Sequence, residues 1–381
     1  MKITFATVFD YPHAGGLSTH VQTLAAALER LGHEPDVLTP RRAGSWRVDL
    51  WARGPSRLLN ALGGGQGLVW SHRVRLSLLA SALSRQGGSD PVIAEDVLAA
   101  LAAERAGRRC LLTVHGYFTR EALSRRGLRP GTVGEAAFAR WEAAGYRAAT
   151  RIVAVDSRIA AHIRGTVGRD DARVQPNFID MAWADALPGR QQARRELGLD
   201  DRPWILCPRR LTPKNGVHVA IAALEQWPEA GLLVVGDGVD RERLEQQARE
   251  GGLAERVRFA GSKPHGAMAA YYAAADLIAV PSVPVAGVEE ATSIAVLEGM
   301  ASGRPVVASA IGGLKELIAS GRNGILVPPN DPPALARALQ EALGQVARLG
   351  AAARDDVRRD HSADAAARAF LDDLRAVAAE A

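Results

Sequence analysis

The sequence predicts an α/β protein built from two Rossmann-like parallel-sheet domains that face each other across a cleft. The length of 381 residues favours two domains, and 47% hydrophobic residues supply enough apolar surface for two cores. Short apolar runs that read as strands alternate with helical patterns in both halves of the chain. Such alternation is typical of parallel sheets whose two faces are covered by helices.

The first half opens with a predicted strand over residues 2–8, a glycine-bearing loop over 10–17 and a helix over 18–31. In that loop, Gly15 and Gly16 would let backbone N–H groups approach phosphate oxygens at the helix N-terminus, and a plain tight turn is the alternative. Further strands are predicted over residues 34–38, 91–94, 110–114 and 152–155, with helices that begin at residues 97 and 133.

The segment 41–89 is predicted to be an irregular excursion from the core, with helical runs near Leu58 and Leu78. It is rich in Arg, Gly and Ser, and it carries tryptophans at positions 46, 51 and 70. We interpret it as a surface that faces a variable substrate. Basic residues beside tryptophans also fit contact with a membrane interface, although a solvated face with partly buried aromatic rings is the favoured interpretation.

The second half restarts the alternation of strands and helices. Strands are predicted over residues 204–208, 232–235, 256–260, 277–280, 306–307 and 325–327. Helices are predicted over 217–224 and 267–275, and again from the end of the last strand to the end of the chain. A proline- and arginine-containing connection precedes this half. The predicted organisation is therefore an N-terminal domain over residues 1–182, a linker over 183–202 and a C-terminal domain over 203–361. A helix at about 362–381 is expected to pack back on the N-terminal domain.

Polar residues that directly follow buried strands are the first candidates for a site. His115 comes immediately after the apolar run CLLTV, and Asp156 with Ser157 ends the next strand in the same way. Open α/β sheets bind ligands at the carboxyl ends of their strands. A satisfied structural histidine is an equally good interpretation of His115 from its position alone.

The stretch 289–307 carries two carboxylates, Glu290 and Glu298, spaced eight residues apart. Thr292 and Ser293 stand between them in positions suited to helix N-caps, and the second glutamate lies in an apolar run. Burying a carboxylate among aliphatic side chains is costly unless something hydrogen-bonds it. A hydroxyl-rich ligand is the partner that we expect.

The loop RRLTPKNG carries Arg210 and Lys214 between a buried strand and a helix. Two cations at a helix N-terminus are suited to holding a diphosphate and stabilising the charge that develops when it leaves. This arrangement removes the need for a metal. A solvated charge cluster is the alternative, and it is less favoured because the loop follows the buried strand WILCP.

Composition narrows the class of protein. A net charge of +5 and a pI near 9.5 permit an anionic partner, but no nucleic-acid-binding module appears, so we expect no nucleic-acid partner. No apolar run of membrane-spanning length and no signal peptide is found, and Cys110 and Cys207 are expected to be reduced thiols of a cytoplasmic protein. Peripheral contact with the inner membrane face, through the basic N-terminal domain, is a further hypothesis.

Several motifs together resemble the family-4 glycosyltransferases, which are retaining enzymes with the two-domain GT-B fold. The Glu290-x7-Glu298 pair, followed by GMASGRPVVAS and GGLKELI, is similar to the family's donor-binding motif. In the family's order, the chain also carries GGLSTHV, TVHG, PNFID, RRLTPKNG, VVGDG and NGILVPPND. The resemblance covers most of the chain except residues 41–89.

The resemblance implies transfer of a hexosyl or N-acetylhexosaminyl group from a nucleotide-diphosphate sugar, with no cofactor required. Glu298 would bind the ribose hydroxyls, Glu290 the donor-sugar hydroxyls, and Arg210 with Lys214 the diphosphate. His115 would lie at the reaction centre, where it would orient a hydroxyl or stabilise developing charge. The N-terminal domain would bind the acceptor and the C-terminal domain the nucleotide sugar.

The remaining predicted site residues fall into two groups. Expected donor contacts, in addition to those above, are Gly15, Gly16, Gly236, Gly261, Ser262, Lys263, Ala291, Thr292, Ser293 and Ile294, with the 261–263 loop meeting the base. Expected acceptor-side residues are Asp10, Tyr11, His20, Tyr117 and Asn177.

Two departures from the family pattern affect these expectations. The family often has a lysine immediately before the glycine at Gly216, and here that position is Asn215. It also commonly has Gly or Phe between the two glutamates, where this chain has Ala291, Thr292 and Ser293. Donor preference is therefore open, with uridine diphosphate the commonest choice of the family.

Three classes of acceptor fit the sequence equally well: a glycan, a lipid-linked intermediate and a small-molecule natural product. A sugar phosphorylase or epimerase on the same fold is the alternative function. An NAD-dependent oxidoreductase is less favoured, because the first strand is not followed by G-x-G-x-x-G with an acidic residue on the second strand.

Overall fold

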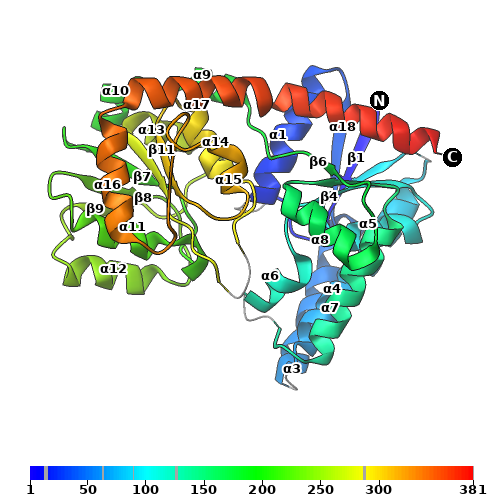
Figure 1. Cartoon of the computed structure of the whole chain (residues 1–381). Helices are drawn as coiled ribbons and strands as arrows, with labels where there is room; N and C mark the ends of the chain where they lie inside the picture. The colour runs from blue at the N-terminus through cyan, green and yellow to red at the C-terminus, as the bar shows by residue number, and fades with distance from the viewer. Residues whose placement is uncertain (13–15, 62–63, 89, 125–127, 286–288, 381) are drawn as a thin grey trace. The chain divides into compact units, whose positions relative to one another are not determined.

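The computed structural model describes residues 1–12, 16–61, 64–88, 90–124, 128–285 and 289–380. The chain forms two compact units, which are coloured along the chain in Figure 1. The N-terminal unit comprises Met1–Pro176 with Asp364–Ala381, and the C-terminal unit comprises Asn177–Ala363. Residues 183–202 belong to the C-terminal unit, where they contribute helix α10 (Arg190–Leu197).

The N-terminal unit contains a six-stranded parallel sheet in the order β2-β1-β3-β4-β5-β6. Its strands are β1 (Lys2–Ala6), β2 (Glu34–Leu38), β3 (Val92–Ala94), β4 (Cys110–Val114), β5 (Arg151–Ala154) and β6 (Arg173–Val174). β3 and β4 are buried along their whole length, as expected for strands covered on both faces. The sheet changes direction between β1 and β3, because β2 extends it on one side and the later strands extend it on the other.

Up to residue 176, the N-terminal unit also contains helices. They are α1 (Gly16–Arg30), α2 (Ser45–Arg47), α3 (Gly54–Ala61), α4 (Gln66–Gln86), α5 (Val97–Arg105), α6 (Phe118–Ser124), α7 (Val133–Ala148) and α8 (Ser157–Val167), with short helical turns η1 (Pro40–Ala43) and η2 (Val48–Arg53).

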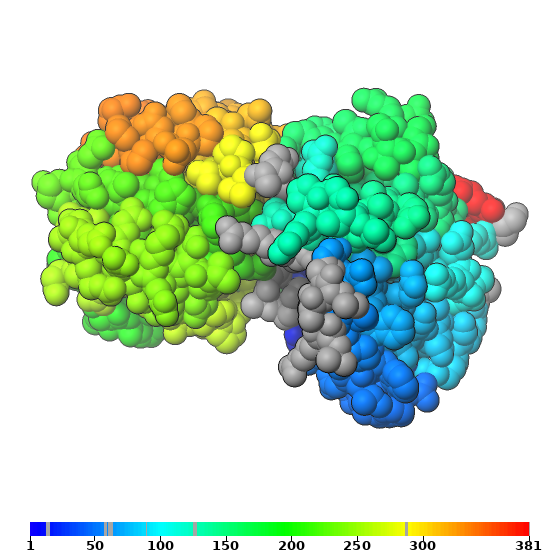
Figure 2. Space-filling view, turned by 90° about the horizontal axis from the view of Figure 1, so that it is seen from below, coloured from blue at the N-terminus to red at the C-terminus, as the bar shows by residue number. Residues whose placement is uncertain are grey.

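The helical runs predicted near Leu58 and Leu78 are confirmed as helices α3 and α4, whereas the prediction that residues 41–89 are otherwise irregular is wrong for most of the segment. Helix α4 runs through 21 residues, and part of the segment forms the blue surface in Figure 2. Its buried side chains Leu76, Leu79, Ala80 and Leu83 recur at the i, i+3, i+4, i+7 spacing of one helix face. The arginines and serines between them fall on the other faces and conceal this stripe in the sequence.

The C-terminal helix α18 (Ala363–Ala379) packs within the N-terminal unit. Phe370 is fully buried and lies edge-on to the His20 ring of α1, with 6.0 Å between ring centroids. Ion pairs also hold the helix, with Arg173 Nη2 2.5 Å from Asp373 Oδ2 and Arg30 Nη2 2.6 Å from Asp364 Oδ1.

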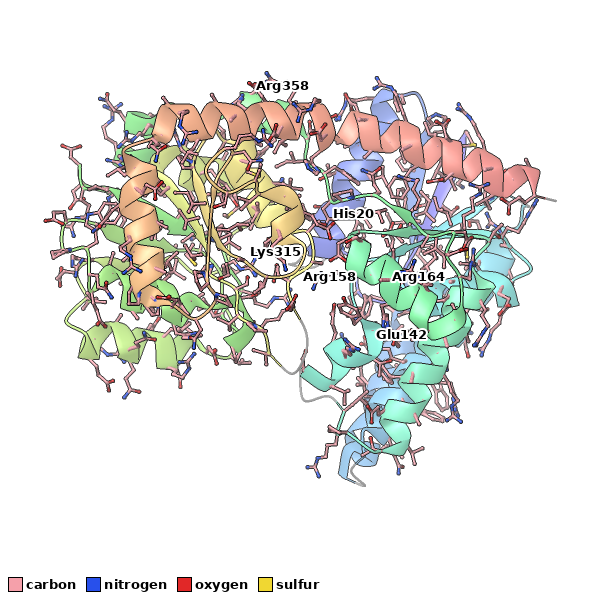
Figure 3. The ribbon with its side chains drawn as sticks, viewed as in Figure 1. His20, Glu142, Arg158, Arg164, Lys315 and Arg358 are labelled. Carbon is pink, nitrogen blue, oxygen red and sulfur yellow. The ribbon has the colours of Figure 1, made fainter. Side chains whose placement is uncertain are left out.

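A buried polar cluster joins three helices of the N-terminal unit. The carboxylate of Glu142 on α7, labelled in Figure 3, accepts hydrogen bonds from Thr119 Oγ1 at 2.6 Å and from Tyr146 Oη at 3.1 Å. His162 Nε2 of α8 lies 3.3 Å from the same carboxylate. A buried carboxylate with this many partners is structurally satisfied.

The C-terminal unit contains a second six-stranded parallel sheet, in the order β12-β11-β10-β7-β8-β9. Its strands are β7 (Trp204–Cys207), β8 (Gly231–Val234), β9 (Val257–Phe259), β10 (Leu277–Val280), β11 (Val306–Ser309) and β12 (Ile325–Val327). Its helices are α9 (Met181–Asp185), α10, α11 (Val217–Leu224), α12 (Arg241–Glu250), α13 (Met268–Ala274), α14 (Ile294–Ala301), α15 (Leu314–Leu317), α16 (Pro332–Leu343) and α17 (Val346–Asp360), with turns η3 (Pro213–Asn215) and η4 (His265–Ala267).

Successive residues of these strands enter opposite cores. Ile205, Cys207 and Leu277 belong to one buried cluster, whereas Leu206 and Ile278 belong to the other. This alternation is what a sheet with helices on both faces requires. The two parallel sheets confirm the predicted α/β class, and the free thiols of Cys110 and Cys207 are both buried.

Gly216→Ala is expected to lower the free energy of unfolding by about 3 kcal/mol or more. Gly216 has a φ of +66°, and an added Cβ would lie 1.7 Å from the carbonyl oxygen of Pro281. Gly252 has the same φ of +66° with open space around it, so Gly252→Ala isolates the backbone strain, about 1–2 kcal/mol. Urea unfolding of both variants measures the difference, and equal losses would contradict the steric argument.

Candidate functional site

In the C-terminal unit, four loops meet at the carboxyl edge of the sheet. The sheet changes direction between β7 and β10, which are hydrogen-bonded neighbours, and open α/β sheets bind ligands outside such a point. Glycines permit the loops to touch through their backbones, because an added Cβ would collide with a neighbouring loop. The collisions are Gly216 with Pro281 O at 1.7 Å, Gly236 with Arg209 O at 2.1 Å, Gly238 with Leu211 O at 2.2 Å and Gly313 with Thr292 N at 2.6 Å.

The guanidinium of Arg209 lies at the centre of these loops and is 7% exposed. Its Nη2 donates to Asn215 Oδ1 at 2.7 Å, to Ser282 Oγ at 2.9 Å and to Glu290 Oε2 at 2.9 Å. Its Nη1 donates to Ser293 Oγ at 3.2 Å. One buried cation therefore connects the loops after β7 and β10.

Glu290 is held by both its backbone and its side chain. Its carbonyl oxygen accepts a hydrogen bond from Gly313 N at 3.0 Å, and its side chain is 15% exposed. Burial raises the pKa of this carboxyl, but the charges of Arg209 and Lys214 outweigh burial and hold the pKa below its ordinary value. Glu290 is therefore ionised, and its carboxylate accepts hydrogen bonds from hydroxyl groups.

Their positions in the sequence suggested that Thr292 and Ser293 cap α14 through their hydroxyls. The structure shows a different use of both hydroxyls. Ser293 is the N-cap residue but makes no side-chain capping bond, because its hydroxyl accepts from Arg209 instead. Thr292 is bonded to Asn177, whose Nδ2 donates to the Thr292 carbonyl at 2.6 Å and to Oγ1 at 3.2 Å. Both hydroxyls therefore position the loop.

Glu298 lies on α14, about two turns beyond Glu290, and is 7% exposed. Its Oε2 accepts from Tyr272 Oη at 2.6 Å, and its Oε1 lies 3.3 Å from His265 Nδ1. The hydrogen bond to Glu298 raises the pKa of His265 against the opposing effect of burial. The ring of Trp183 stacks on His265, with 5.7 Å between centroids.

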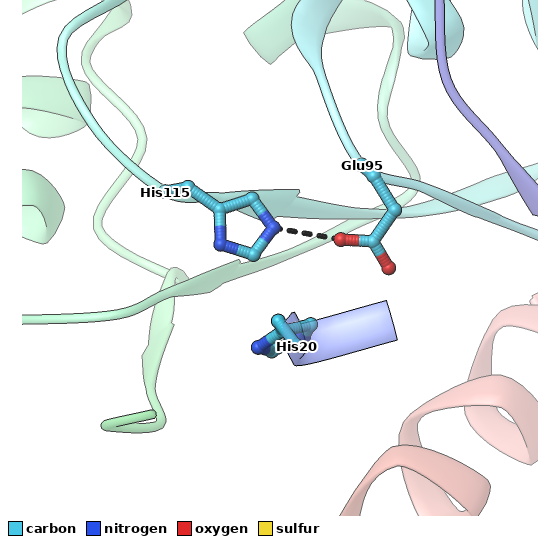
Figure 4. A group of neighbouring side chains, drawn as sticks. All are labelled: His20, Glu95 and His115. Carbon is cyan, nitrogen blue, oxygen red and sulfur yellow. Dashed lines mark hydrogen bonds and ion pairs between the residues drawn. The ribbon is translucent and has the colours of Figure 1, made fainter. Parts of the chain in front are cut away.

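In the N-terminal unit, Glu95 follows β3 and His115 follows β4, so both side chains start from the carboxyl edge of that sheet. His115 Nε2 lies 2.7 Å from Glu95 Oε2, and the His20 ring of α1 stands edge-on to His115 at 4.6 Å (Figure 4). Burial raises the pKa of Glu95 to about 7 and lowers that of His115 to about 4.

The other predicted acceptor-side residues are also engaged by protein groups. Asp10 pairs with Arg41 at 3.0 Å, Arg53 at 3.1 Å and Arg75 at 3.4 Å. Burial raises the pKa of Asp10, but Arg75 and Arg41 outweigh it and lower the pKa overall. Three further predicted residues have these surroundings: the Tyr117 ring packs edge-on against His162, Tyr11 has a pKa raised by burial and by Glu95, and Asn177 is bonded to Thr292.

Comparison with known proteins identifies the family. Residues 14–183 match the family model "Glycosyltransferase Family 4", and residues 189–355 match "Glycosyl transferases group 1". The D-inositol 3-phosphate glycosyltransferase of Xylanimonas cellulosilytica is 31% identical over 94% of this chain and 91% of that protein. The chain belongs to glycosyltransferase family 4. This family-4 glycosyltransferase is therefore a transferase enzyme, as its motifs predicted.

Two further comparisons cover different extents of the glycosyltransferase. The 2-deoxystreptamine N-acetyl-D-glucosaminyltransferase of Streptomyces fradiae is 32% identical over 59% of this chain, and the match spans only 55% of that relative. The sucrose-phosphate synthase structure from Thermosynechococcus elongatus superposes with a TM-score of 0.81 over the full length of both chains at 23% identity. At that identity the likeness shows the shared fold.

The structure brings some predicted donor residues of the glycosyltransferase together and leaves others apart. Glu290, Ser293 and the loop of Lys214 meet around Arg209, and Gly236 packs on the Arg209 backbone. In the same unit, Arg210, Ser262 and Lys263 are exposed, Ala291 and Ile294 are half-buried, and the carbonyl of Gly261 accepts from Gly236 N at 3.0 Å. Gly16 belongs to the N-terminal unit and is exposed. Gly15 lies outside the described residues.

Sequence reasoning missed three groups of site residues: Arg209 with Asn215 and Ser282, Glu95, and the Glu298 partners Tyr272 and His265. Glu95 follows the buried strand VIA just as His115 follows CLLTV, so the same strand-end rule identifies it. Arg209 is the second residue after β7. It is followed directly by Arg210, and the sequence alone does not tell which of the two arginines enters the site.

Proposed function

We propose that this glycosyltransferase moves a hexosyl or N-acetylhexosaminyl group from a nucleoside-diphosphate sugar to an acceptor hydroxyl, with retention at the anomeric carbon. The observation that carries the proposal is the ionised Glu290 carboxylate beside Arg209, with Glu298 two turns further along the same segment. Two buried carboxylates at a strand-end ligand site suit a ligand with two separate sets of hydroxyls.

In this proposal, the C-terminal unit binds the donor. Glu298 accepts hydrogen bonds from the ribose hydroxyls, and Glu290 accepts them from the transferred sugar. Arg210 and Lys214, together with the backbone N–H groups at the start of α14, hold the diphosphate and stabilise the charge that develops on it. Arg209 orients Glu290 and the Ser293 hydroxyl. These residues suffice for leaving-group stabilisation, so we propose that catalysis needs no metal or other cofactor.

The N-terminal unit binds the acceptor in this proposal, and His115 lies at the reaction centre. The acceptor hydroxyl attacks the anomeric carbon on the face that the diphosphate leaves, the bond from that carbon to the diphosphate breaks, and a leaving phosphate oxygen takes the hydroxyl proton. This course accounts for retention without a covalent intermediate. The Streptomyces relative is named for 2-deoxystreptamine and the Xylanimonas relative for inositol 3-phosphate. Both are cyclitols, so a small cyclitol is our first acceptor class, ahead of a glycan or a lipid-linked intermediate.

A panel of nucleotide sugars tests the function directly. We expect release of uridine diphosphate from UDP-glucose or UDP-N-acetylglucosamine when myo-inositol, inositol 3-phosphate or 2-deoxystreptamine is present. Release from GDP-mannose alone would replace the uridine donor, and phosphorolysis of a glycoside by inorganic phosphate would favour a phosphorylase. Absence of release from every donor with every acceptor would refute glycosyl transfer to this class.

Glu298→Ala is expected to weaken uridine diphosphate binding by about 10- to 100-fold, because two ribose hydroxyls lose a charged acceptor. Titration calorimetry measures the dissociation constant. Glu341, an exposed residue of α16, provides a matched control, since Glu341→Ala also removes a carboxylate but lies away from the strand-end loops. Equal affinities for the wild type and Glu298→Ala would remove Glu298 from the ribose site.

Peripheral membrane contact is a secondary proposal. Across the described part of the chain, no helix combines enough length with enough apolar character to cross a bilayer. Trp46, Leu50 and Trp51 are exposed beside Arg47, whereas Arg53 is already paired with Asp49 at 3.2 Å. The proposed contact is with the inner membrane face, from the cytoplasm. We expect the protein to co-sediment with anionic phosphatidylglycerol vesicles, and the double variant Trp46→Ser/Trp51→Ser to lose this binding.

A further inference from the structure

The carboxylate of Glu95 is completely buried and has one described partner. Its Oε2 lies 2.7 Å from His115 Nε2, and the Glu95 side chain is 0% exposed. Among the described residues, its Oε1 has no hydrogen-bond partner. A buried carboxylate with a single partner is costly to keep, so a role in fixing that partner explains it better than stability does.

We propose that Glu95 is a positioning residue that keeps a proton on His115 Nε2, which leaves His115 Nδ1 as a hydrogen-bond acceptor for a reacting hydroxyl. Nδ1 lies on the ring edge away from the hydrogen bond to Glu95 (Figure 4). A histidine nitrogen accepts or donates according to the bond that the other nitrogen makes. The proposal rests on the proposed function only in placing His115 at the reaction centre.

The number of protons that Glu95 and His115 share changes with pH and decides whether Nδ1 accepts or donates. When Glu95 is ionised and His115 neutral, the pair holds one proton, which lies on Nε2, and Nδ1 is an acceptor. A second proton either charges the imidazole or converts Glu95 to an acid that donates to Nε2. In both cases Nδ1 becomes an N–H donor.

The surroundings place this change near neutral pH. Burial raises the pKa of Glu95 to about 7, although the facing His20 of α1 lowers it to a smaller extent. Among the described residues, Tyr11 in the loop after β1 and Glu121 of α6 also act on this pair, and Glu121 raises the pKa of His115 against burial. The acceptor form therefore dominates above about pH 7 and is lost as the pH falls.

A metal ion is the competing explanation of this cluster. One donor atom from each of His20, Glu95 and His115 lies within 4.8 Å of the others. However, the 2.7 Å separation of Glu95 and His115 is the length of a charge-assisted hydrogen bond, which requires a proton between the two atoms. A metal bound to both atoms would displace that proton. We therefore infer that Glu95 and His115 are joined by a hydrogen bond and do not bind a metal.

The test is nitrogen-15 NMR of histidine-labelled protein, with His115→Gln to assign the signals. In the wild type at pH 8, we expect His115 as the Nε2–H tautomer. Glu95→Gln can present either its oxygen or its amide N–H to Nε2, so a mixture of tautomers is expected. If the glutamine variant does not fold, Glu95→Asp replaces it in the test. The aspartate keeps the charge, but its shorter side chain no longer reaches His115 Nε2 as Glu95 does. Glu104→Gln is the matched control, because Glu104 is an exposed residue of α5.

The pH profile of turnover gives a second readout, with the active donor from the panel of UDP-glucose, UDP-N-acetylglucosamine and GDP-mannose. The acid limb near pH 7 should move below pH 5 in Glu95→Gln, where residue 95 no longer titrates and His115 still does, and turnover should fall about 10-fold. Uridine diphosphate affinity should stay unchanged.

Three results are distinguishable. An unchanged tautomer and acid limb in Glu95→Gln would overturn the proposal. Stoichiometric binding of zinc that shifts the His20 and His115 signals in the wild type, but not in Glu95→Gln, would also overturn it in favour of a metal site. If no nucleotide sugar is turned over, the proposed function fails, while the NMR tautomer still decides the role of Glu95.

Discussion

Glu290→Gln is expected to reduce turnover by about 100- to 1,000-fold while the fold and uridine diphosphate affinity are retained. The amide keeps the shape of the side chain and can still accept from Arg209 through its oxygen. It removes the negative charge that we propose accepts hydrogen bonds from the sugar hydroxyls. Glu290→Ala is expected to abolish transfer with the fold preserved, but it also leaves the buried Arg209 without its carboxylate, so the glutamine variant separates chemistry from stability more cleanly.

Glu289→Gln is the matched control for Glu290→Gln, because it makes the same chemical change one residue away. The Glu289 carboxylate accepts from Gly312 N at 3.0 Å, which supports the loop and does not involve Arg209. Its loss should reduce turnover by about 10-fold or less. A Glu290→Gln enzyme with turnover within threefold of the wild type would exclude Glu290 from the sugar site.

Arg209→Met is expected to cost about 3–5 kcal/mol of unfolding free energy and nearly all turnover. The change removes four hydrogen bonds and leaves the buried Glu290 carboxylate without its guanidinium partner, with Lys214 as a remaining nearby cation. Arg210→Met is the control: its exposed side chain should change stability by only about 0.5 kcal/mol, while uridine diphosphate binding weakens.

The double variant Arg209→Met/Glu290→Gln tests whether the two side chains act as a pair. Removing both charges should recover part of the stability that Arg209→Met loses, so the two effects should not add. Urea unfolding of the four proteins completes the cycle. Strict additivity would show that Arg209 stabilises the loops without coupling to Glu290.

The strands were predictable because parallel strands covered on both faces are continuous apolar runs. CLLTV and LIAV are unbroken, and their predicted bounds agree with β4 and β10. A helical run near Leu78 was predicted, but the full extent of α4 was not, because arginines and serines interrupt its narrow buried stripe of Leu76, Leu79 and Leu83.

Site residues were predictable where their spacing in the sequence identifies them. They were not predictable where the direction of a side chain decides its contacts. Glu290 and Glu298 are paired by their spacing on one segment. Arg209 and Arg210 are adjacent, and only the turn after β7 decides that the first is buried against Glu290 while the second is exposed. The contact of Glu95 with His115 joins residues 20 positions apart on neighbouring strands, which no local pattern records.

The hydrogen bonds between Asn177 and Thr292 have a consequence for any attempt to isolate the C-terminal unit as a fragment. A polypeptide that begins at residue 203 would lack Asn177, Trp183 and α10. It would therefore lose the Asn177 bonds to Thr292, the Trp183 ring stacked on His265 and part of the packing around α13. The backbone of Ile179 also forms a β-bridge with residues 361–363, so the first and last residues of this unit are hydrogen-bonded to each other. The smallest autonomous fragment is expected to run from residue 177 to 363.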